Sequence, residues 1–201
     1  MKKFGLLLLY EIVFCGCGVC QQELTKDDVY YAKEITVYGV DFSNAVIIHE
    51  SEEHIAMLEN DYYFTINNLF FLQKFNDLKK VMKNKLKGNE EFTQERNKNL
   101  EKKYTIYDLS IIQKIISEYN TPEKEGIGLV FIVKSLDKPN KKVELFPTFF
   151  NIETKQVIWT FKVEGRGGKY GLEIYWSEKM VNAIDNFIEA YSSEFSYEYG
   201  R

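Results

Sequence analysis

The first apolar run of the chain lies at its amino terminus. Phe4 to Phe14 is largely apolar and is interrupted by Glu11, and Lys2 and Lys3 precede it. A helix needs roughly 20 apolar residues to cross a bilayer, so this run is too short to span a membrane. Its length and positive flank are typical of a signal peptide, although the Glu11 carboxylate weakens insertion. The chain is therefore expected to be exported.

Behind this leader, the spacing of apolar residues predicts two strands and then several helices. Apolar and polar residues alternate from Glu34 to Phe42, as in a half-buried strand, and Ala45 to His49 forms a second short apolar run. Ser51 is placed to cap a helix in which apolar residues recur every three or four positions from Ile55 to Phe70. Two more helices are expected over 75–86 and 109–119.

The second half of the chain predicts three strands and one long helix. Ile127 to Leu136, Val143 to Asn151 and Val157 to Val163 are apolar, and short polar connections join them. Such connections favour an antiparallel meander. Leu172 to Phe195 is then expected to be a long amphipathic helix. The predicted fold class is α+β: a mixed sheet with a three-stranded antiparallel meander, helices packed on it, and the amphipathic helix at the carboxyl end.

Composition and charge fit one ordinary domain. The chain has 201 residues, of which 45% are hydrophobic and 28% are charged, and its formal net charge is -4. A domain of this size holds together through its core, and so small a charge does not indicate a nucleic-acid partner. The expected organisation is a signal peptide over 1–17, a polar tether over 18–33 and one domain over 34–201. A charged excursion near 88–104 is interpreted as a solvated helix extension or a mobile segment.

The cysteines lie at the end of the leader. Cys15, Cys17 and Cys20 are the only ones in the chain, and Gly16 is the only small residue that directly precedes one of them. Phe14-Cys15-Gly16-Cys17 therefore resembles the lipobox of bacterial lipoproteins, which predicts lipid attachment at Cys17. Cleavage without lipid and a Cys-x-Cys-x-x-Cys site for a soft metal are the alternatives. An acyl chain on Cys17 would hold the domain at a membrane surface.

A glycine-rich segment before the last helix is the first candidate binding site. It contains Gly165, Arg166, Gly167, Gly168 and Lys169. Glycines at a helix N-terminus cradle anions, and the two basic side chains add positive charge. Tyr170 stands where a Walker A loop would carry Ser or Thr. The alternative interpretation is a strand-to-helix connection that requires a positive φ.

The other candidate sites lack the residue spacing that a metal site or a catalytic site requires. His49 and His54, the only histidines, are five positions apart, whereas a zinc protease helix needs a spacing of four. A solvated helix start is expected there, and no metal site. The lysines over 74–87 could form a basic face for an anionic membrane or cell-wall polymer, or a merely solvated one. No nucleophile has an evident base, so neither an enzyme nor a cofactor is expected.

One hairpin resembles a known pattern. Phe149 to Trp159 is similar to the Asp-x-x-Thr-Gly/Lys-x-Val-x-Trp hairpin of envelope proteins. These include the amino-terminal domain of TolB, the curli secretion lipoproteins, and the outer-membrane lipoproteins that activate cell-wall synthases. Asn151 and Thr154 suit its tight turn, Lys155 stands where Gly is common, and Val157 and Trp159 are expected to alternate onto one core face.

Two further segments, over 37–43 and at Tyr175-Trp176, resemble exported proteins of Bacteroidetes-type bacteria. Together the resemblances imply an envelope compartment. The expected function is an exported, periplasmic, lipid-anchored binding or assembly module with an envelope protein partner. The alternatives are an anion or polymer binder using Gly165 to Lys169, and an enzyme with an unidentified carboxylate site.

Overall fold

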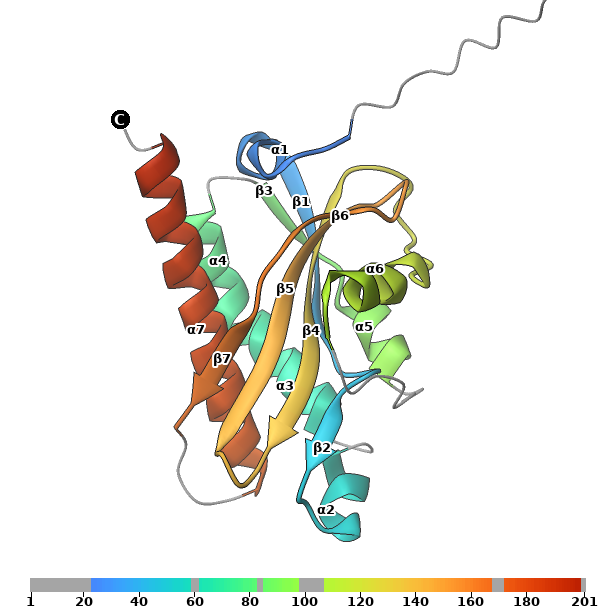
Figure 1. Cartoon of the computed structure of the whole chain (residues 1–201), viewed down its shortest axis with the longest axis vertical. Helices are drawn as coiled ribbons and strands as arrows, with labels where there is room; N and C mark the ends of the chain where they lie inside the picture. The colour runs from blue at the N-terminus through green and yellow to red at the C-terminus, as the bar shows by residue number, and fades with distance from the viewer. Residues whose placement is uncertain (1–22, 59–61, 83–84, 98–106, 168–171, 200–201) are drawn as a thin grey trace, which may run out of the picture.

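A mixed sheet forms the centre of this computed structural model, which describes residues 23–58, 62–82, 85–97, 107–167 and 172–199. Figure 1 shows the sheet running along the long axis of the molecule. The strands are β1 (Glu34–Asp41), β2 (Val46–Ile48), β3 (Lys85–Gly88), β4 (Ile127–Asp137), β5 (Lys142–Asn151), β6 (Val157–Thr160) and β7 (Val163–Arg166). Their order is β3-β1-β4-β5-β6, with β2 paired to β4 and β7 paired to β5.

The sheet combines parallel and antiparallel pairs. β3, β1 and β4 run parallel, whereas β4, β5 and β6 form an antiparallel meander. The α+β class, the mixed sheet and the meander predicted from the sequence are therefore confirmed. The signal peptide and Cys17 lie outside the described residues.

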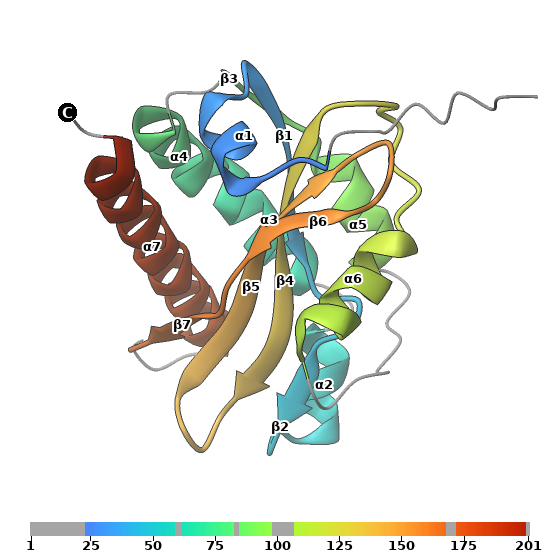
Figure 2. The same cartoon turned by 45° about the horizontal axis from the view of Figure 1, so that its top comes forward.

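Helices cover both faces of the sheet (Figures 1 and 2). One face carries α3 (Tyr63–Leu69), the π-helix η2 (Phe70–Lys74), α4 (Phe75–Val81) and α7 (Leu172–Tyr199). The other face carries α5 (Glu90–Asn97) and α6 (Leu109–Ser117). α2 (Glu52–Met57) follows β2, and Ser51 caps it by accepting a hydrogen bond from the backbone of His54, as predicted. None of the described helices combines the length and apolar character that a membrane-spanning helix needs.

The sheet has a hydrophobic core on each face, and a bulge in β1 directs side chains into both of them. The register against β4 shifts between Val37 and Gly39, so Tyr38 is an extra residue. Val37 and Val40 then pack in the core beneath α7, while Tyr38 packs in the core beneath α6. Gly39 has a φ of +85°, and a Cβ there would lie 2.3 Å from the side chain of Asn67. Only glycine fits this bend.

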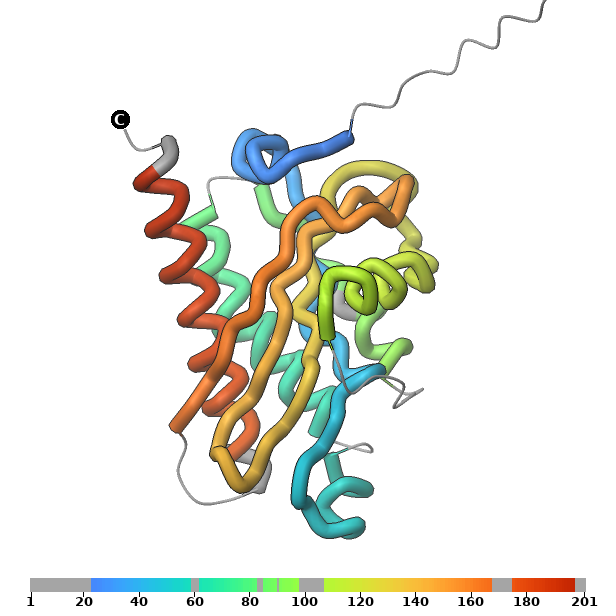
Figure 3. Tube along the Cα trace, viewed as in Figure 1, coloured from blue at the N-terminus to red at the C-terminus, as the bar shows by residue number. Residues whose placement is uncertain are grey.

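The last predicted strand, over 157–163, is two strands. β6 pairs with Thr148 to Phe150 and β7 pairs with Lys142 to Leu145, so neither of these two strands pairs with Phe146 and Pro147 of β5. Pro147 has no amide hydrogen for a ladder bond, and proline favours such interruptions. The chain path in Figure 3 shows β6 and β7 following one another along β5.

The helix predicted over 75–86 is also wrong at its end. α4 ends at Val81, and Leu86 lies in β3 beside Ile35 of β1. Leu86 follows Met82 by four positions, so its spacing mimics a continuing helix. As part of a strand, Leu86 is buried in the core between β1 and α4. An apolar residue at this position is therefore as compatible with a strand as with a helix.

The polar tether expected over 18–33 is wrong for its second part. Residues Lys26–Tyr31 form α1, in which Val29 and Tyr30 are buried. The ring of Tyr30 lies 5.8 Å from that of Trp159 and 5.0 Å from that of Tyr191. This short helix therefore belongs to the domain, because its apolar side docks between β6 and α7.

Candidate functional site

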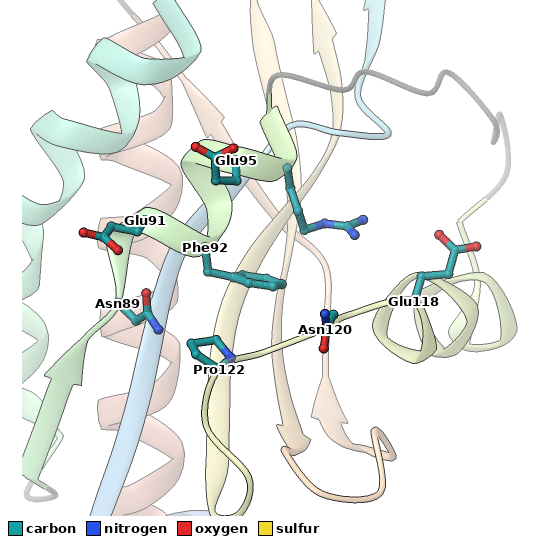
Figure 4. A pocket seen from close by; sticks show the side chains of 8 residues that line it. Asn89, Glu91, Phe92, Glu95, Glu118, Asn120 and Pro122 are labelled. Atoms are coloured by element: carbon teal, nitrogen blue, oxygen red, sulfur yellow. The ribbon is translucent and has the colours of Figure 1, made fainter.

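A groove of about 430 Å³ lies between α5 and the segment that leads from α6 to β4. Figure 4 shows the side chains around it. The residues that line the groove are Asn89, Glu91, Phe92, Glu95, Arg96, Glu118, Asn120 and Pro122. Its walls are polar and carry more acidic than basic groups, and its floor is aromatic.

The floor is the half-buried ring of Phe92. The Phe92 ring lies 5.1 Å from that of Tyr38 and 4.9 Å from that of Tyr119, each in an edge-on arrangement. Tyr119 in turn meets Phe150 of β5 edge-on at 5.7 Å. Aromatic pairs at these distances and angles are favourable, so the floor is fixed to the core of the sheet.

Among the lining residues that the structure describes, the one cation is paired with a carboxylate. Arg96 Nε donates to Asp41 Oδ2 at 3.1 Å, and its guanidinium lies 4.4 Å from the centre of the Tyr119 ring. Burial disfavours the charge on Arg96, but the neighbouring Asp41 carboxylate outweighs this effect and the pKa of Arg96 is raised. Tyr119 also donates to Asp41, at 2.5 Å, and burial raises the pKa of Tyr119 well above its ordinary value.

The carboxylates are exposed to solvent. Glu91 and Glu95 lie one helical turn apart on α5, and Glu118 lies at the end of α6 (Figure 4). Glu91 and Glu118 form no ion pair with any residue that the structure describes. Among the described lining residues, carboxylates outnumber cations, and both Asp41 and Glu118 act electrostatically on Arg96.

A fourth carboxylate lies next to the groove and is held rigidly. Glu123 accepts hydrogen bonds from the Tyr38 hydroxyl at 2.8 Å and from Asn89 Nδ2 at 3.0 Å. Burial alone would raise the pKa of Glu123, but these hydrogen bonds outweigh it and the pKa is lowered. Burial and Glu123 together raise the pKa of Tyr38 far above its ordinary value.

Polar side chains, rather than an apolar stripe, attach α5 to the sheet. β3 ends at Gly88, so among the described strands none pairs with the second half of β1 on that side. Thr93 Oγ1 donates to Tyr38 O at 2.6 Å. Asn97 accepts from Phe42 N at 2.7 Å and donates to Val40 O at 3.0 Å. α5 thus satisfies the backbone of β1 as a neighbouring strand would.

This attachment corrects the interpretation of 88–104 as a charged excursion. Its described part is α5, in which Thr93 and Asn97 are buried, and residues 98–104 lie outside the described residues. The sequence pattern missed the groove because α5 is fixed mainly by polar residues and contributes a single aromatic contact, Phe92, in place of an apolar stripe. Only the one-turn spacing of Glu91 and Glu95 beside an aromatic residue signals it.

The predicted glycine-rich site lies elsewhere. Gly165 and Arg166 belong to β7, and the Arg166 side chain pairs with Glu164 at 3.1 Å. A Cβ on Gly165 would lie 1.8 Å from the carbonyl oxygen of Lys179 in α7, so this glycine allows close strand–helix packing. Gly167 has a φ of +100°, which confirms a connection that requires a positive φ. Gly168 and Lys169 lie outside the described residues, and anion binding here stays a prediction.

The remaining candidates show ordinary contacts. His54 Nδ1 lies 3.0 Å from Glu50, and His49 is exposed. In the described part of the chain, no cluster of His, Cys, Asp and Glu side chains suits a metal ion. The predicted basic face over 74–87 is partly neutralised, and Lys83 lies outside the described residues. Four of its lysines pair with carboxylates: Lys74 with Asp185, Lys80 with Asp77, Lys85 with Glu34, and Lys87 with Glu123.

Comparison with known proteins finds distant structural likenesses. No family model and no curated protein matches this chain. The chain is similar to the C-terminal domain of LpoB from Salmonella enterica, with 12% identity and a TM-score of 0.34 over 68% of this chain and 84% of that one. It is also similar to lipoprotein GNA1162 from Neisseria meningitidis, with 11% identity and a TM-score of 0.33 over 77% and 97%. Likenesses at these TM-scores assign no role to this chain.

Proposed function

We propose that this chain is an exported, lipid-anchored, non-enzymatic module that docks a cationic segment of an envelope protein in the groove between α5 and α6. The observation that carries this proposal is the groove itself. Exposed carboxylates of Glu91 and Glu118 line the groove together with the ring of Phe92, and among the described lining residues the one cation, Arg96, is paired with Asp41. The signal-peptide pattern and Cys17 support the compartment and the anchor.

A lysine or arginine side chain fits this arrangement chemically. Its apolar stem would contact Phe92, its charge would attract the rim carboxylates, and a cation over an aromatic face gains about 0.5–2 kcal/mol. Asn89 and Asn120 line the same groove and provide side-chain amides for a bound main chain. A partner segment with one such anchor and further positive charge would bind weakly and in a salt-dependent manner.

An enzyme is a poorer explanation of the same geometry. Acid–base catalysis by a carboxylate generally relies on burial or a charged neighbour to bring its pKa toward neutrality. Glu91, Glu95 and Glu118 are exposed, and the buried carboxylate of Asp41 is occupied by Arg96 and Tyr119. The groove therefore favours binding over chemistry.

A binding measurement with the purified chain tests the groove. Fluorescence anisotropy with labelled hexalysine is expected to show binding that weakens as salt rises. Joint replacement of Glu91 and Glu118 by Gln should weaken binding at least about tenfold, a loss of about 1.4 kcal/mol. Joint replacement of the exposed Glu52 and Glu53 by Gln is the matched control, because it removes the same charge from α2. Equal losses in both double variants would reduce the effect to net charge and contradict docking in the groove.

Mass spectrometry of the mature amino terminus tests the anchor separately. Expression with the native leader should yield a chain that begins at Cys17 and carries the mass of attached lipid. Cys17→Ala should remove that mass, whereas Cys15→Ala and Cys20→Ala should leave it. A mature chain that starts at another residue, or that carries no lipid, would refute the anchor.

A further inference from the structure

A second, apolar socket of about 470 Å³ lies on the α3–α4 side of the sheet. It is lined by Asn68, Phe71, Leu72, Phe75 and Gly88. Leu72 is 74% exposed, and it belongs to the π-helix η2, a rare element that occurs frequently at functional sites. The ring of Phe71 lies close to the backbone of Gly88, at the end of β3. The socket therefore opens beside an edge of the sheet.

That edge is β3, which pairs with β1 alone among the described strands. Lys85 N donates to Lys33 O and Asn89 N donates to Val37 O, so alternate amides face β1. By the alternation of a β-ladder, the amides of Leu86 and Gly88 face outward. An outward row of backbone groups is a template for one more strand.

The two faces of this edge differ in chemistry. Leu86 is buried toward α4, and Gly88 lies on the same face beside Phe71. Lys85 and Lys87 lie on the opposite face, and their side chains are 79% and 56% exposed. A strand added to β3 would therefore place alternate side chains beside the socket and beside the lysines.

The lysines determine which strand fits. A second copy of this chain would set its own Lys85 and Lys87 against these, and like charges on neighbouring strands are destabilising. The ion pair of Lys85 with Glu34 is exposed, so it contributes little and a partner carboxylate can replace it. Glu123 is half-buried, but the Lys87 side chain that meets it at 3.5 Å is 56% exposed, and its ammonium has further donors for a partner carboxylate. Lys79 places a further cation 4.4 Å from the centre of the Phe75 ring, at the socket.

We infer that the β3 edge and its apolar socket bind an extended segment of a partner protein in which acidic and large apolar residues alternate. The segment adds a strand to β3 by main-chain hydrogen bonds. One apolar side chain enters the socket between Phe71, Leu72 and Phe75, and the acidic side chains meet Lys85 and Lys87. This surface shares no residue with the acidic groove, so either binding site can fail in experiment while the other stands.

The probe for this site is a labelled peptide, acetyl-Gly-Glu-Leu-Glu-Phe-Glu-Leu-Gly-amide. In fluorescence anisotropy with the full chain it should bind, and the same peptide with Lys in place of Glu should bind at least about tenfold more weakly. Leu72→Glu should weaken binding of the acidic peptide at least about tenfold. Leu109→Glu is the matched control, because Leu109 is also exposed but lies on α6.

Two further measurements separate strand addition from general attraction. Joint replacement of Lys85 and Lys87 by Glu should exchange the preference, so that the Lys-containing peptide binds better than the acidic one. Methylation of alternate peptide amides should weaken binding by removing main-chain donors. The inference is overturned if the acidic peptide does not bind, or if Leu72→Glu binds it as tightly as wild type. It is also overturned if replacement of Lys85 and Lys87 by Glu leaves the peptide preference unchanged.

Discussion

The side chain of Asn67 accepts a hydrogen bond from the backbone amide of Val40 at 2.8 Å. Asn67 is fully buried on α3, and its other amide atom donates to Thr93 of α5 at 3.2 Å. One asparagine thus joins a helix from each face of the sheet to the bulged strand β1. This contact fixes the position of α5 and, through it, the wall of the acidic groove.

Replacement of Asn67 by Ala should therefore destabilise the domain. The variant leaves the Val40 amide without the Asn67 acceptor and removes the hydrogen bond from Asn67 to Thr93, and an unsatisfied buried amide costs about 1–3 kcal/mol. We expect urea unfolding to show a loss in this range. Asn68→Ala is the control, since half-buried Asn68 accepts one hydrogen bond from Gln94 at 3.3 Å and should lose less than about 1 kcal/mol. Equal losses in the two variants would contradict the linking role of Asn67.

This arrangement was beyond the reach of the sequence pattern. Periodicity finds helices that bury an apolar stripe, and it located α6 and α7 for that reason. α5 docks through one aromatic residue, Phe92, and through Thr93 and Asn97, which the same pattern assigns to solvent. The acidic groove depends on α5, so the pattern could predict the sheet but not the site beside it.

Gly165→Ala is expected to be among the most damaging single changes in the described part of the chain. The added methyl group would lie 1.8 Å from Lys179 O and 2.7 Å from Ala183 N, and backbone atoms of a long helix cannot move aside individually. Separation of β7 from α7 should cost about 1–3 kcal/mol or more, measured as a lower midpoint in thermal unfolding.

Arg166→Ala provides the comparison for Gly165. The Arg166 side chain is exposed and pairs with Glu164 on the surface, so its loss should change stability by less than about 0.5 kcal/mol. If the anion-binding interpretation of the segment is correct, Arg166→Ala should reduce phosphate binding without lowering the melting temperature. Similar stability losses in both variants would contradict the close packing of Gly165 on α7.

Trp159→Ala tests the position of the tryptophan in the hairpin. Trp159 is half-buried; its ring stacks on Phe149 at 5.4 Å and lies 4.9 Å from the Lys26 ammonium. Full burial of a tryptophan predicts a loss of about 3–5 kcal/mol on truncation, so half-burial should give about 2–3 kcal/mol in urea unfolding. A loss below about 1 kcal/mol would show that α1 and β6 do not pack around this ring.

The hairpin itself shows what a local pattern can and cannot predict. The turn is as expected: Asn151 accepts from the amides of Glu153 and Thr154, and Lys155 has a φ of +59°, a conformation that favours glycine. The expectation that Val157 and Trp159 share a core face is wrong. A register shift opposite Phe149 and Phe150 sends Val157 to the α6 side and Trp159 to the α7 side. Such a bulge depends on the neighbouring strand, which local alternation does not include.

Lys179 is a buried cation that forms no ion pair with the residues the structure describes. Its residue is fully buried on α7, and its ammonium donates to Tyr175 O at 3.2 Å and lies 3.0 Å from the centre of the Tyr175 ring. Burial lowers the pKa of Lys179 from 10.5 to about 8. Protonation of Lys179 therefore opposes folding.

Lys179→Met should stabilise the domain near neutral pH. Methionine keeps most of the apolar stem and removes the desolvation cost of the ammonium; for buried ionic groups, apolar replacement is often neutral or stabilises by up to about 4 kcal/mol. Because the pKa falls on folding, the cost of the charge is fully present below about pH 8 and disappears as the pH approaches 10.5. Urea unfolding of both proteins at pH 7 and pH 10 should thus show a gain from Lys179→Met that shrinks at the higher pH. A difference that is constant with pH would mean that the ammonium pays no desolvation cost, and a destabilised variant at pH 7 would mean that its contact with the Tyr175 ring outweighs that cost.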